Sequence, residues 1–287
     1  MKNIRIVTDT TSTLTYEQAK ECNIELVSLS VLLDGKEYKD FIDMSGEDLN
    51  KVLKDGGVPT TSQPNIGYVR EKMLEWKEAK DDAIIIISIS SGLSGTYQGF
   101  KLMADQLEMD NIYLVDSSSV AAPIMDAART ARKMADQDAE IAEILEMLDY
   151  KFKNTTSYLY PHDLVQLKKG GRISPIAANM ASMLKIKPLL VLAKDGSVVD
   201  KYGMARTEGK IFDMIIKALI KDGVDGKTHN LYIPHVLAYE TAVSFAALAK
   251  DKLNSIQCIL LPLPAVLTCH GGLGCMAVQS VIKHKCD

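Results

Sequence analysis

The sequence contains few cysteines, and their spacing excludes a disulfide framework. Only five of the 287 residues are cysteine, and no two of them form a C-x-x-C pair. We therefore expect reduced, mostly buried thiols. Four of the five histidines also lack metal-ligand spacing to cysteine or carboxylate, so we expect no metal and no cofactor. These four are His162, His229, His235 and His284.

Long apolar runs and blocks of like charge are lacking as well. No apolar stretch reaches about 18 residues, the length that a membrane-spanning helix needs. The start, Met-Lys-Asn, leads directly into an apolar run without a signal-peptide pattern. The 33 basic and 37 acidic residues are interspersed and give a net charge of -4, unlike a nucleic-acid-binding surface. We expect a cytoplasmic protein without a transmembrane segment and without a nucleic-acid partner.

The first half of the chain alternates apolar runs with amphipathic segments, which favours βα units around a parallel sheet. The expected strands, of which we predict the last two to be buried on both faces, are Ile4–Val7, Ile24–Leu33, Ile84–Ile89 and Ile112–Val115. The expected helices are Asn65–Ala79 and Asp138–Leu148, each with one apolar face.

The pattern changes near residue 155, where we place a domain boundary between residues 1–155 and 156–287. Gly170-Gly171 ends a short helix, and Ser174-Pro175 begins another that we expect over Ile176–Leu184. Asp195-Gly196 predicts a hairpin with a type I′ turn. The remaining expected elements complete an α+β second domain: strands Ser157–Tyr160, Lys187–Ala193, Val198–Ala205, Asn230–Val236 and Gln257–Leu261, and helices Asp163–Lys168, Glu208–Leu219 and Ala238–Leu253.

Small polar residues follow several expected strands, where parallel α/β folds bind their ligands. The loop from Ser90 to Thr96 combines hydroxyls with two glycines before a helix, which suits an anionic carboxylate or phosphate. It is not a P-loop, because no lysine follows Gly95. The runs beginning at Thr60, Asp9 and Asp116 repeat the theme more weakly, and the run Thr60–Pro64 taken alone is better explained by an N-cap with a β-turn.

Two further residues stand in glycine-rich surroundings. His270 lies in the run Thr268-Cys269-His270-Gly271-Gly272-Leu273-Gly274, where a functional and a structural role are equally plausible. Arg172 follows two glycines and is either a solvated surface side chain or a charge that faces an acidic group or a partner.

Several of these segments resemble, in the same order, the DegV family of bacterial fatty-acid-binding proteins. The matching segments are Val7–Thr10, Thr61–Pro64, Ile89–Gln98 (ISSGLSGTYQ), Leu167–Ile173 (LKKGGRI) and Leu184–Leu189 (LKIKPL). The resemblance covers nearly the whole chain. It implies an α/β fold with an N-terminal three-layer α/β/α domain around a parallel sheet and a C-terminal two-layer α/β domain with a mixed sheet.

The resemblance also implies a function and the residues that serve it. Such a protein is not itself an enzyme: it buries one long-chain fatty acid, such as palmitate, stearate or oleate, and presents the carboxyl group to a separate fatty acid kinase catalytic subunit, which forms an acyl phosphate for phospholipid synthesis. Carried over to this chain, Arg172 and His270 serve phosphotransfer or kinase docking. The residues implied to bind the carboxyl group are Thr61, Ser62, Ser94, Gly95, His270 and Gly271.

One departure from the family pattern concerns the histidine loop. The family usually has His-x-Gly-Pro-Gly where this chain has His270-Gly271-Gly272-Leu273-Gly274, and loss of the proline loosens the loop. Residues on the helix after Pro175 are candidates to line the acyl tail, because methionine adapts to irregular cavities and alanine leaves room. Ordinary core packing explains these residues equally well: Ala177, Met180, Ala181, Met183 and Leu184.

Two alternative functions remain open from the sequence. Ser94, Asp116 and His270 follow the Ser-Asp-His chain order of an α/β serine hydrolase or esterase, although Thr96 stands where the nucleophile elbow has glycine. A subunit of a sugar or dihydroxyacetone kinase would instead hold a small hydrophilic substrate. An apolar tunnel, or its absence, separates that alternative from lipid binding.

Overall fold

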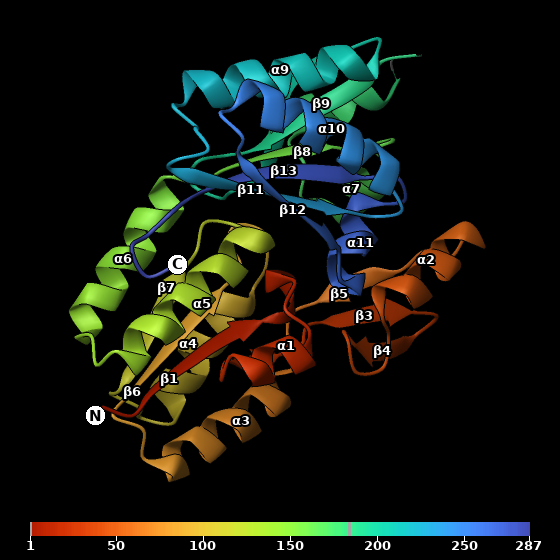
Figure 1. Ribbon diagram of the computed structural model, residues 1–287. Helices are drawn as coiled ribbons and strands as arrows, with labels where there is room; N and C mark the ends of the chain where they lie inside the picture. Colours follow the sequence, from red (N-terminus) through yellow and green to blue (C-terminus); the bar gives the residue numbers. More distant parts are fainter. Residues whose placement is uncertain (1, 183–184) are drawn as a thin grey trace.

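The computed structural model describes residues 2–182 and 185–287 and has two main sheets, each with its own helices (Figure 1). The first sheet is parallel, with the strand order β2-β1-β6-β7. Its strands are β1 (Ile4–Asp9), β2 (Glu25–Val27), β6 (Ala83–Ser88) and β7 (Ile112–Asp116). Every residue of β6 is buried, as the isoleucine run predicts, whereas β7 is an edge strand whose residues are half-buried. The prediction that Ile112–Val115 is buried on both faces is therefore wrong.

Helices cover both faces of this parallel sheet and give the expected three layers. Helices α3 (Ile66–Ala79) and α4 (Thr96–Gln106) pack on one face, where Trp76 of α3 shares a core with Ile86 of β6. The alternate residues Ile85 and Ile87 face the opposite core. The helices of that second face are α1 (Tyr16–Glu21), α5 (Ala122–Asp136) and α6 (Ile141–Lys153).

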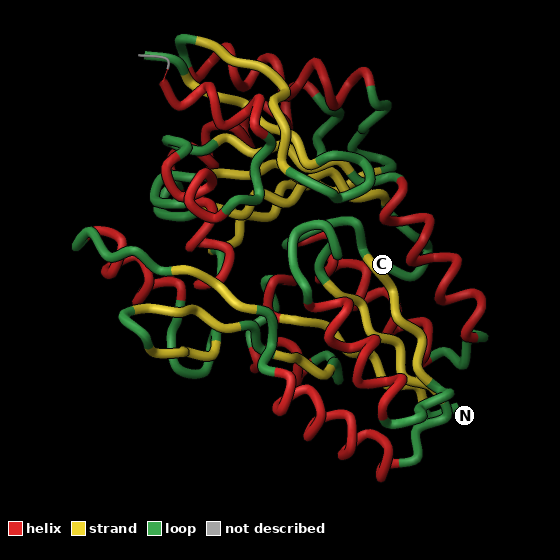
Figure 2. Tube along the Cα trace, turned by 180° about the vertical axis from the view of Figure 1, so that it is seen from behind, coloured by secondary structure: helices red, strands yellow, loops and turns green. Residues whose placement is uncertain are grey.

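The second sheet is mixed and has the strand order β10-β9-β8-β13-β11-β12. Its strands are β8 (Thr156–Tyr160), β9 (Lys187–Leu192), β10 (Val199–Ala205), β11 (His229–His235), β12 (Gln257–Pro262) and β13 (Met276–Ile282). Helices α9 (Glu208–Lys221) and α10 (Tyr239–Lys252) cover the outer face, and the inner face looks toward the first domain (Figures 1 and 2). This arrangement confirms a two-layer C-terminal domain.

A third, small sheet with the order β4-β3-β5 extends from the first domain. It comprises β3 (Ser30–Leu33), β4 (Lys36–Lys39) and β5 (Thr60–Ser62), with α2 (Gly46–Lys54) beside it. The prediction of one strand over Ile24–Leu33 is wrong, because β2 and β3 belong to different sheets. The chain leaves the ladder between them, where Ser28 Oγ donates to Asp40 O at 2.9 Å and Leu29 N donates to Thr10 Oγ1 at 3.2 Å.

Helix α11 (Ala265–Gly271) belongs to the C-terminal half of the chain but packs against this small sheet. Val266 and Cys269 of α11 share a core with Leu49 of α2 and Val31 of β3. In Figure 1, α11 projects from the upper sheet toward β5 and α2. The two halves of the chain are therefore interlocked as well as adjacent.

The short helices α7 (Val165–Gly170) and α8 (Pro175–Ala178) follow β8. Helix α8 begins as expected, with Ser174 Oγ accepting from Ala177 N at 3.1 Å, but from Asn179 the chain continues as a 3-10 turn to Ser182. The predicted turn type at Asp195-Gly196 is wrong, because only Gly196 has positive φ, and a type I′ turn needs two such residues.

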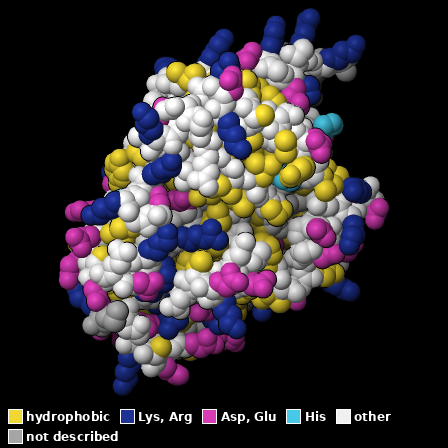
Figure 3. Space-filling view, in the orientation of Figure 1, with side chains coloured by type: hydrophobic (Ala, Val, Ile, Leu, Met, Phe, Trp, Pro, Cys, Tyr) yellow, Lys and Arg dark blue, Asp and Glu magenta, His cyan; other side chains and the backbone are white. Residues whose placement is uncertain are grey.

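The surface carries both signs of charge. On the face shown in Figure 3, basic and acidic side chains are interspersed, in agreement with the sequence pattern. Across residues 2–182 and 185–287, no helix combines the length and the apolar character that a bilayer crossing requires.

Candidate functional site

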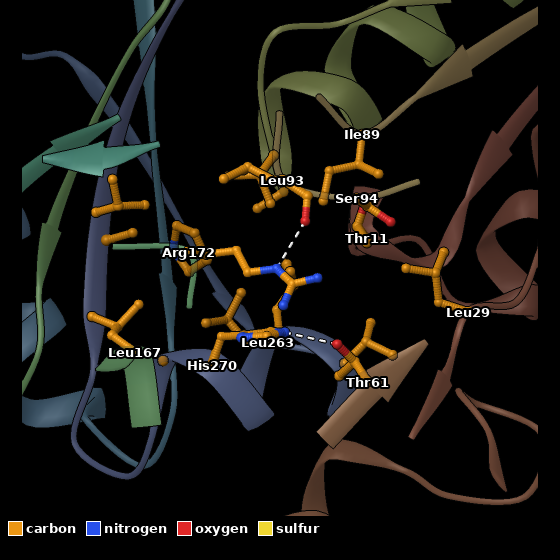
Figure 4. Close-up of a pocket in the computed structure, with 18 of the residues that line it drawn as sticks. Thr11, Leu29, Thr61, Ile89, Leu93, Ser94, Leu167, Arg172, Leu263 and His270 are labelled. Carbon is orange, nitrogen blue, oxygen red and sulfur yellow. Dashed lines mark hydrogen bonds between the residues drawn. The ribbon is translucent and has the colours of Figure 1, made fainter. Parts of the chain in front are cut away.

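A cavity of about 490 Å³ lies between the two domains, a volume in the usual range of small-molecule sites (Figure 4). Loops at the carboxyl ends of β1, β6 and β7 form one wall, β5 and α11 close one side, and the inner faces of β8 and β13 form the opposite wall. The cavity is therefore at the edge of the parallel sheet where ligands of such folds bind.

Most of the cavity wall is aliphatic. Ile89 and Leu93 project from the N-terminal domain, and Leu167 and Leu263 project from the C-terminal domain (Figure 4). Further apolar side chains complete the wall: Leu29, Val120, Leu159, Val199, Pro234, Val266, Leu267 and Ala277. Such a wall favours a hydrocarbon ligand and disfavours the small hydrophilic substrate of a sugar kinase subunit, whose hydroxyls would be left without partners.

The side chain of His270 lies against Thr61 across the domain boundary. His270 Nε2 is 2.8 Å from Thr61 Oγ1, whereas Nδ1 has no hydrogen-bond partner among the described residues. Burial, reinforced by the nearby Arg172, lowers the pKa of His270 from 6.5 to about 4. The imidazole is therefore neutral at pH 7 and can donate to, or accept from, a ligand or the Thr61 hydroxyl.

The main chain at Gly170 packs on the open edge of this imidazole. A Cβ at Gly170 would lie 2.2 Å from His270 Nδ1, so no larger residue fits there without moving the histidine. Gly171, with φ +70°, ends α7 in the left-handed region. The two glycines thus have different roles, of which sequence analysis predicted only the helix-terminating one.

Arg172 is held by the main chain of two loops. Its Nε donates to Leu93 O at 3.0 Å (Figure 4). Its Nη1 donates to Gly170 O at 2.5 Å. The guanidinium lies at the cavity beside His270 and retains further N–H donors. It places a fixed positive charge where an anionic head group would enter.

The serine-rich loop contributes a second group of polar atoms. Ser94 Oγ lies 2.8 Å from Thr96 Oγ1 and accepts from Thr96 N at 3.4 Å, so the hydroxyl lies at the first turn of α4. A Cβ at Gly95 would lie 1.9 Å from Gln63 Oε1, which explains why this position has no side chain. The β5 segment and this loop are therefore packed closely together.

Asp9 organises the neighbouring strand ends from a fully buried position. Its carboxylate accepts from Thr11 N and from Ile89 N, both at 2.9 Å, and its burial raises the pKa of the carboxyl group. These bonds hold the ends of β1 and β6 together and direct Thr11 to the cavity wall.

The structure brings all of the residues expected at the head group to one cavity. Thr61, Ser62, Ser94, Gly95, His270, Gly271 and Arg172 line it together. Sequence analysis placed Thr11 at the same sheet edge as part of a weak polar run and included Gln63 in the Thr61–Pro64 segment without giving it a role. It missed Leu159, Ala277 and Gln279, which carry no local motif. Alternation along β8 and β13 was the available signal for the last three.

The expected lining of the acyl tail stays a prediction. Ala177 and Met180 are buried in the main core and are not among the described residues that line the cavity. The structure does not describe the side chain of Ala181, and Met183 and Leu184 lie outside the described residues.

The alternative Ser-Asp-His hydrolase site is not assembled. Ser94 pairs with Thr96, and Asp116 Oδ1 accepts from the main-chain N–H groups of Ser91 and Ser118. His270 pairs with Thr61 instead. Within residues 2–182 and 185–287, no three His, Cys, Asp or Glu side chains cluster as metal ligands.

The fold and this site together define a two-domain α/β protein with a largely apolar cavity between its domains. A sequence pattern described as "Uncharacterised protein, DegV family" matches residues 3–283. The chain belongs to the DegV family.

Relatives and a solved structure agree with this assignment over nearly their full lengths. The chain is 30% identical to a DegV domain-containing protein of Listeria monocytogenes, over 98% of this chain and 99% of that one. It is 27% identical to a fatty acid-binding protein of Thermotoga maritima, over 94% and 95%. The crystal structure of DegV, a fatty acid binding protein from Bacillus subtilis, has a TM-score of 0.85 at 26% identity and covers 99% of this chain and 100% of its own.

Proposed function

We propose that this protein binds one long-chain fatty acid, such as palmitate, stearate or oleate, in the cavity between its domains. The observation that carries the proposal is the division of the cavity into an aliphatic wall and one polar group made by Thr61, Ser94, Arg172 and His270. The fatty acid binding of the relatives from T. maritima and B. subtilis supports it.

The energetics fit a lipid with the carboxyl group at the polar end. Burying one methylene contributes roughly 0.8 kcal/mol, so about fifteen of them contribute on the order of 12 kcal/mol before ordering costs. Each hydroxyl or N–H bond to the carboxylate contributes only about 1–3 kcal/mol net. The tail therefore supplies affinity, and the polar group fixes the orientation.

In this proposal the protein is a carrier without catalytic activity of its own. A separate fatty acid kinase catalytic subunit phosphorylates the bound acid for phospholipid synthesis, in the cytoplasm. Arg172 supports this role because its charge lies at the cavity, anchored by main-chain oxygens rather than by an acidic partner. A guanidinium held in this way can neutralise the charge that develops on a transferred phosphoryl group.

Native and denaturing mass spectrometry of the purified protein tests the binding role. We expect one fatty acid per chain, released on denaturation. The variant Ala277→Phe fills the cavity from β13, and we expect a folded protein without ligand, whereas Ala277→Ser leaves the space open and keeps the ligand. A wild-type protein that carries and takes up no fatty acid contradicts the proposal.

A further inference from the structure

Gln279 lies at the end of the cavity that is remote from His270. Ala277 and Gln279 of β13 line the cavity, as does Cys275 directly before the strand, in agreement with the two-residue period of an extended chain. Cys275 lies beside Gly271, where a glycine Cβ would be 3.2 Å from its Sγ. Four residues of extended chain place Gln279 roughly 13 Å further along the cavity.

The amide of Gln279 is almost fully buried and bridges the two domains. It is 1% exposed. Its Nε2 donates to Val120 O at 2.8 Å and to Ser157 Oγ at 2.9 Å, and its Oε1 accepts from Ala122 N at 3.1 Å. The side chain therefore grips the main chain on both sides of Ala121.

Ala121 has a backbone conformation that L residues rarely adopt, with φ 66° and ψ -134°. It is 3% exposed and lines the cavity next to Val120. Its own N–H donates to Thr11 O at 3.0 Å. A strained residue of this kind persists only where its surroundings hold it. Here its own N–H is held by Thr11, and its two neighbours Val120 and Ala122 are held by Gln279 of the other domain.

The start of α5 depends on the same amide. Ala121 occupies the N-cap position and offers no side-chain oxygen. Pro123 has no N–H and the N–H of Ile124 donates to Ala121 O at 3.0 Å, so the N–H of Ala122 is the one left to be satisfied from outside the helix. Gln279 Oε1 accepts from this first N–H of the helix at 3.1 Å. Because the Gln279 donors are both used, the amide closes the cavity without offering a free N–H to the ligand.

We propose that Gln279 is a positioning residue that holds the Val120–Ala122 bend across the far end of the cavity and thereby sets which acyl chain lengths fit. The inference rests on the proposed fatty acid binding and adds a determinant of specificity to it. A rigid cavity end discriminates sharply between acyl chains of different length. Each methylene that fits into the cavity raises the affinity by about fourfold, and one that does not fit loses this gain.

The variant Gln279→Met tests this proposal, because it keeps the side-chain volume and removes all three hydrogen bonds. Delipidated protein is offered an equimolar mixture of saturated acids from C14 to C20, and native mass spectrometry gives the bound ratio of each chain. We expect the wild type to select a narrow range, and the variant to lose about tenfold or more of the discrimination between chains four carbons apart. An unchanged profile in a folded Gln279→Met protein overturns the proposal.

A second substitution separates positioning from general structural support. Glycine adopts positive φ without strain, so Ala121→Gly allows the bend to form without the clamp. We expect Ala121→Gly/Gln279→Met to recover the profile of Ala121→Gly alone to within about threefold. If the double variant is as unselective as Gln279→Met, Gln279 does not act by holding the Val120–Ala122 bend.

A Gln279→Met protein that does not fold and a wild type that binds no fatty acid have different consequences. If Gln279→Met does not fold, Ser157→Ala removes only the outer anchor of the amide, and we expect a smaller shift in the same direction; no shift overturns the proposal. If the wild type binds none of the acids, the proposed function itself fails, independently of Gln279.

Discussion

His270 Nε2 lies 2.8 Å from Thr61 Oγ1, although the two residues are 209 positions apart in the chain. Thr61 is in a strand of the small sheet, and His270 is in a helix that follows the last but one strand of the other domain. The contact exists because α11 packs against the small sheet. A head group bound between them touches both halves of the chain at once.

The ionisation of His270 predicts a pH-dependent stability. A folded-state pKa of about 4 against 6.5 means that the unfolded chain binds the proton first, so stability is present above pH 6.5 and is lost as the pH falls. Between pH 7 and pH 5, we expect wild type to lose about 2 kcal/mol relative to His270→Asn. Urea unfolding of both proteins at the two pH values measures the difference, and parallel pH profiles would falsify a buried neutral imidazole.

Asp40 predicts the opposite dependence. Asp40 is fully buried and packs against the first residue of α11. Its Oδ1 accepts from Ala265 N at 3.0 Å, and its Oδ2 has no partner among the described residues. Burial raises its pKa from 3.8 to about 7, so the folded protein takes up a proton that the unfolded chain does not. Stability therefore rises as the pH falls through 7.

Comparison with Asp40→Asn measures this effect, because asparagine keeps the shape and the acceptor. Between pH 8 and pH 6, we expect wild type to gain about 1 kcal/mol relative to the variant in the free energy of unfolding. His270→Asn, measured over the same range, serves as a control in which the Asp40 contribution persists. A wild-type protein whose stability stays level with that of Asp40→Asn would mean that the carboxyl titrates normally.

Gly95→Ala is expected to destabilise the protein and to reduce fatty acid binding. The added Cβ would lie 1.9 Å from Gln63 Oε1, so β5 and the serine-rich loop must separate. We expect a loss of about 1–3 kcal/mol. Gly209→Ala in α9 is the matched control, because nothing lies within 4 Å of its Cβ, and alanine there should stabilise by up to about 1 kcal/mol. Thermal unfolding of the two variants should move in opposite directions.

The variant Arg172→Lys tests the proposed presentation of the fatty acid to a kinase separately from fatty acid binding. Lysine keeps the charge but cannot reproduce the geometry of the bonds to Leu93 O and Gly170 O. We expect fatty acid binding within about threefold of wild type and acyl phosphate formation reduced by about a hundredfold. The measurement is ADP release by a fatty acid kinase catalytic subunit with the loaded protein. Equal turnover with both proteins would remove Arg172 from the transfer step.

The sequence predicts the sheets well where local pattern and burial agree. The isoleucine run of β6 favours a buried strand, because isoleucine is β-branched, and the single apolar face of α3 matches its place on the sheet. The break between β2 and β3 was not predictable in this way. It depends on the hydrogen bonds that Leu29 N donates to Thr10 Oγ1 and that Ser28 Oγ donates to Asp40 O, whose partners lie 19 and 12 residues apart in the chain.

At the cavity too, residues in local motifs could be predicted, whereas residues that depend on distant contacts could not. Thr61, Ser94 and His270 stand in recognisable polar or glycine-rich runs, so their grouping could be expected. Gln279 stands in an ordinary strand, and its importance appears only when the bend at Ala121, 158 positions earlier, is seen to lie against it. A contact between residues of different domains cannot be predicted from the local sequence around either residue.

Because α11 packs against the small sheet, part of the cavity wall comes from residues that are synthesised late in the chain. A growing chain that has reached β12 already contains the parallel sheet, the small sheet and five of the six strands of the second sheet. It still lacks His270, Cys275, Ala277 and Gln279, and with them one side and one end of the cavity. The side of the cavity at α11 and the part of its wall at β13 can therefore form only after synthesis has passed residue 279.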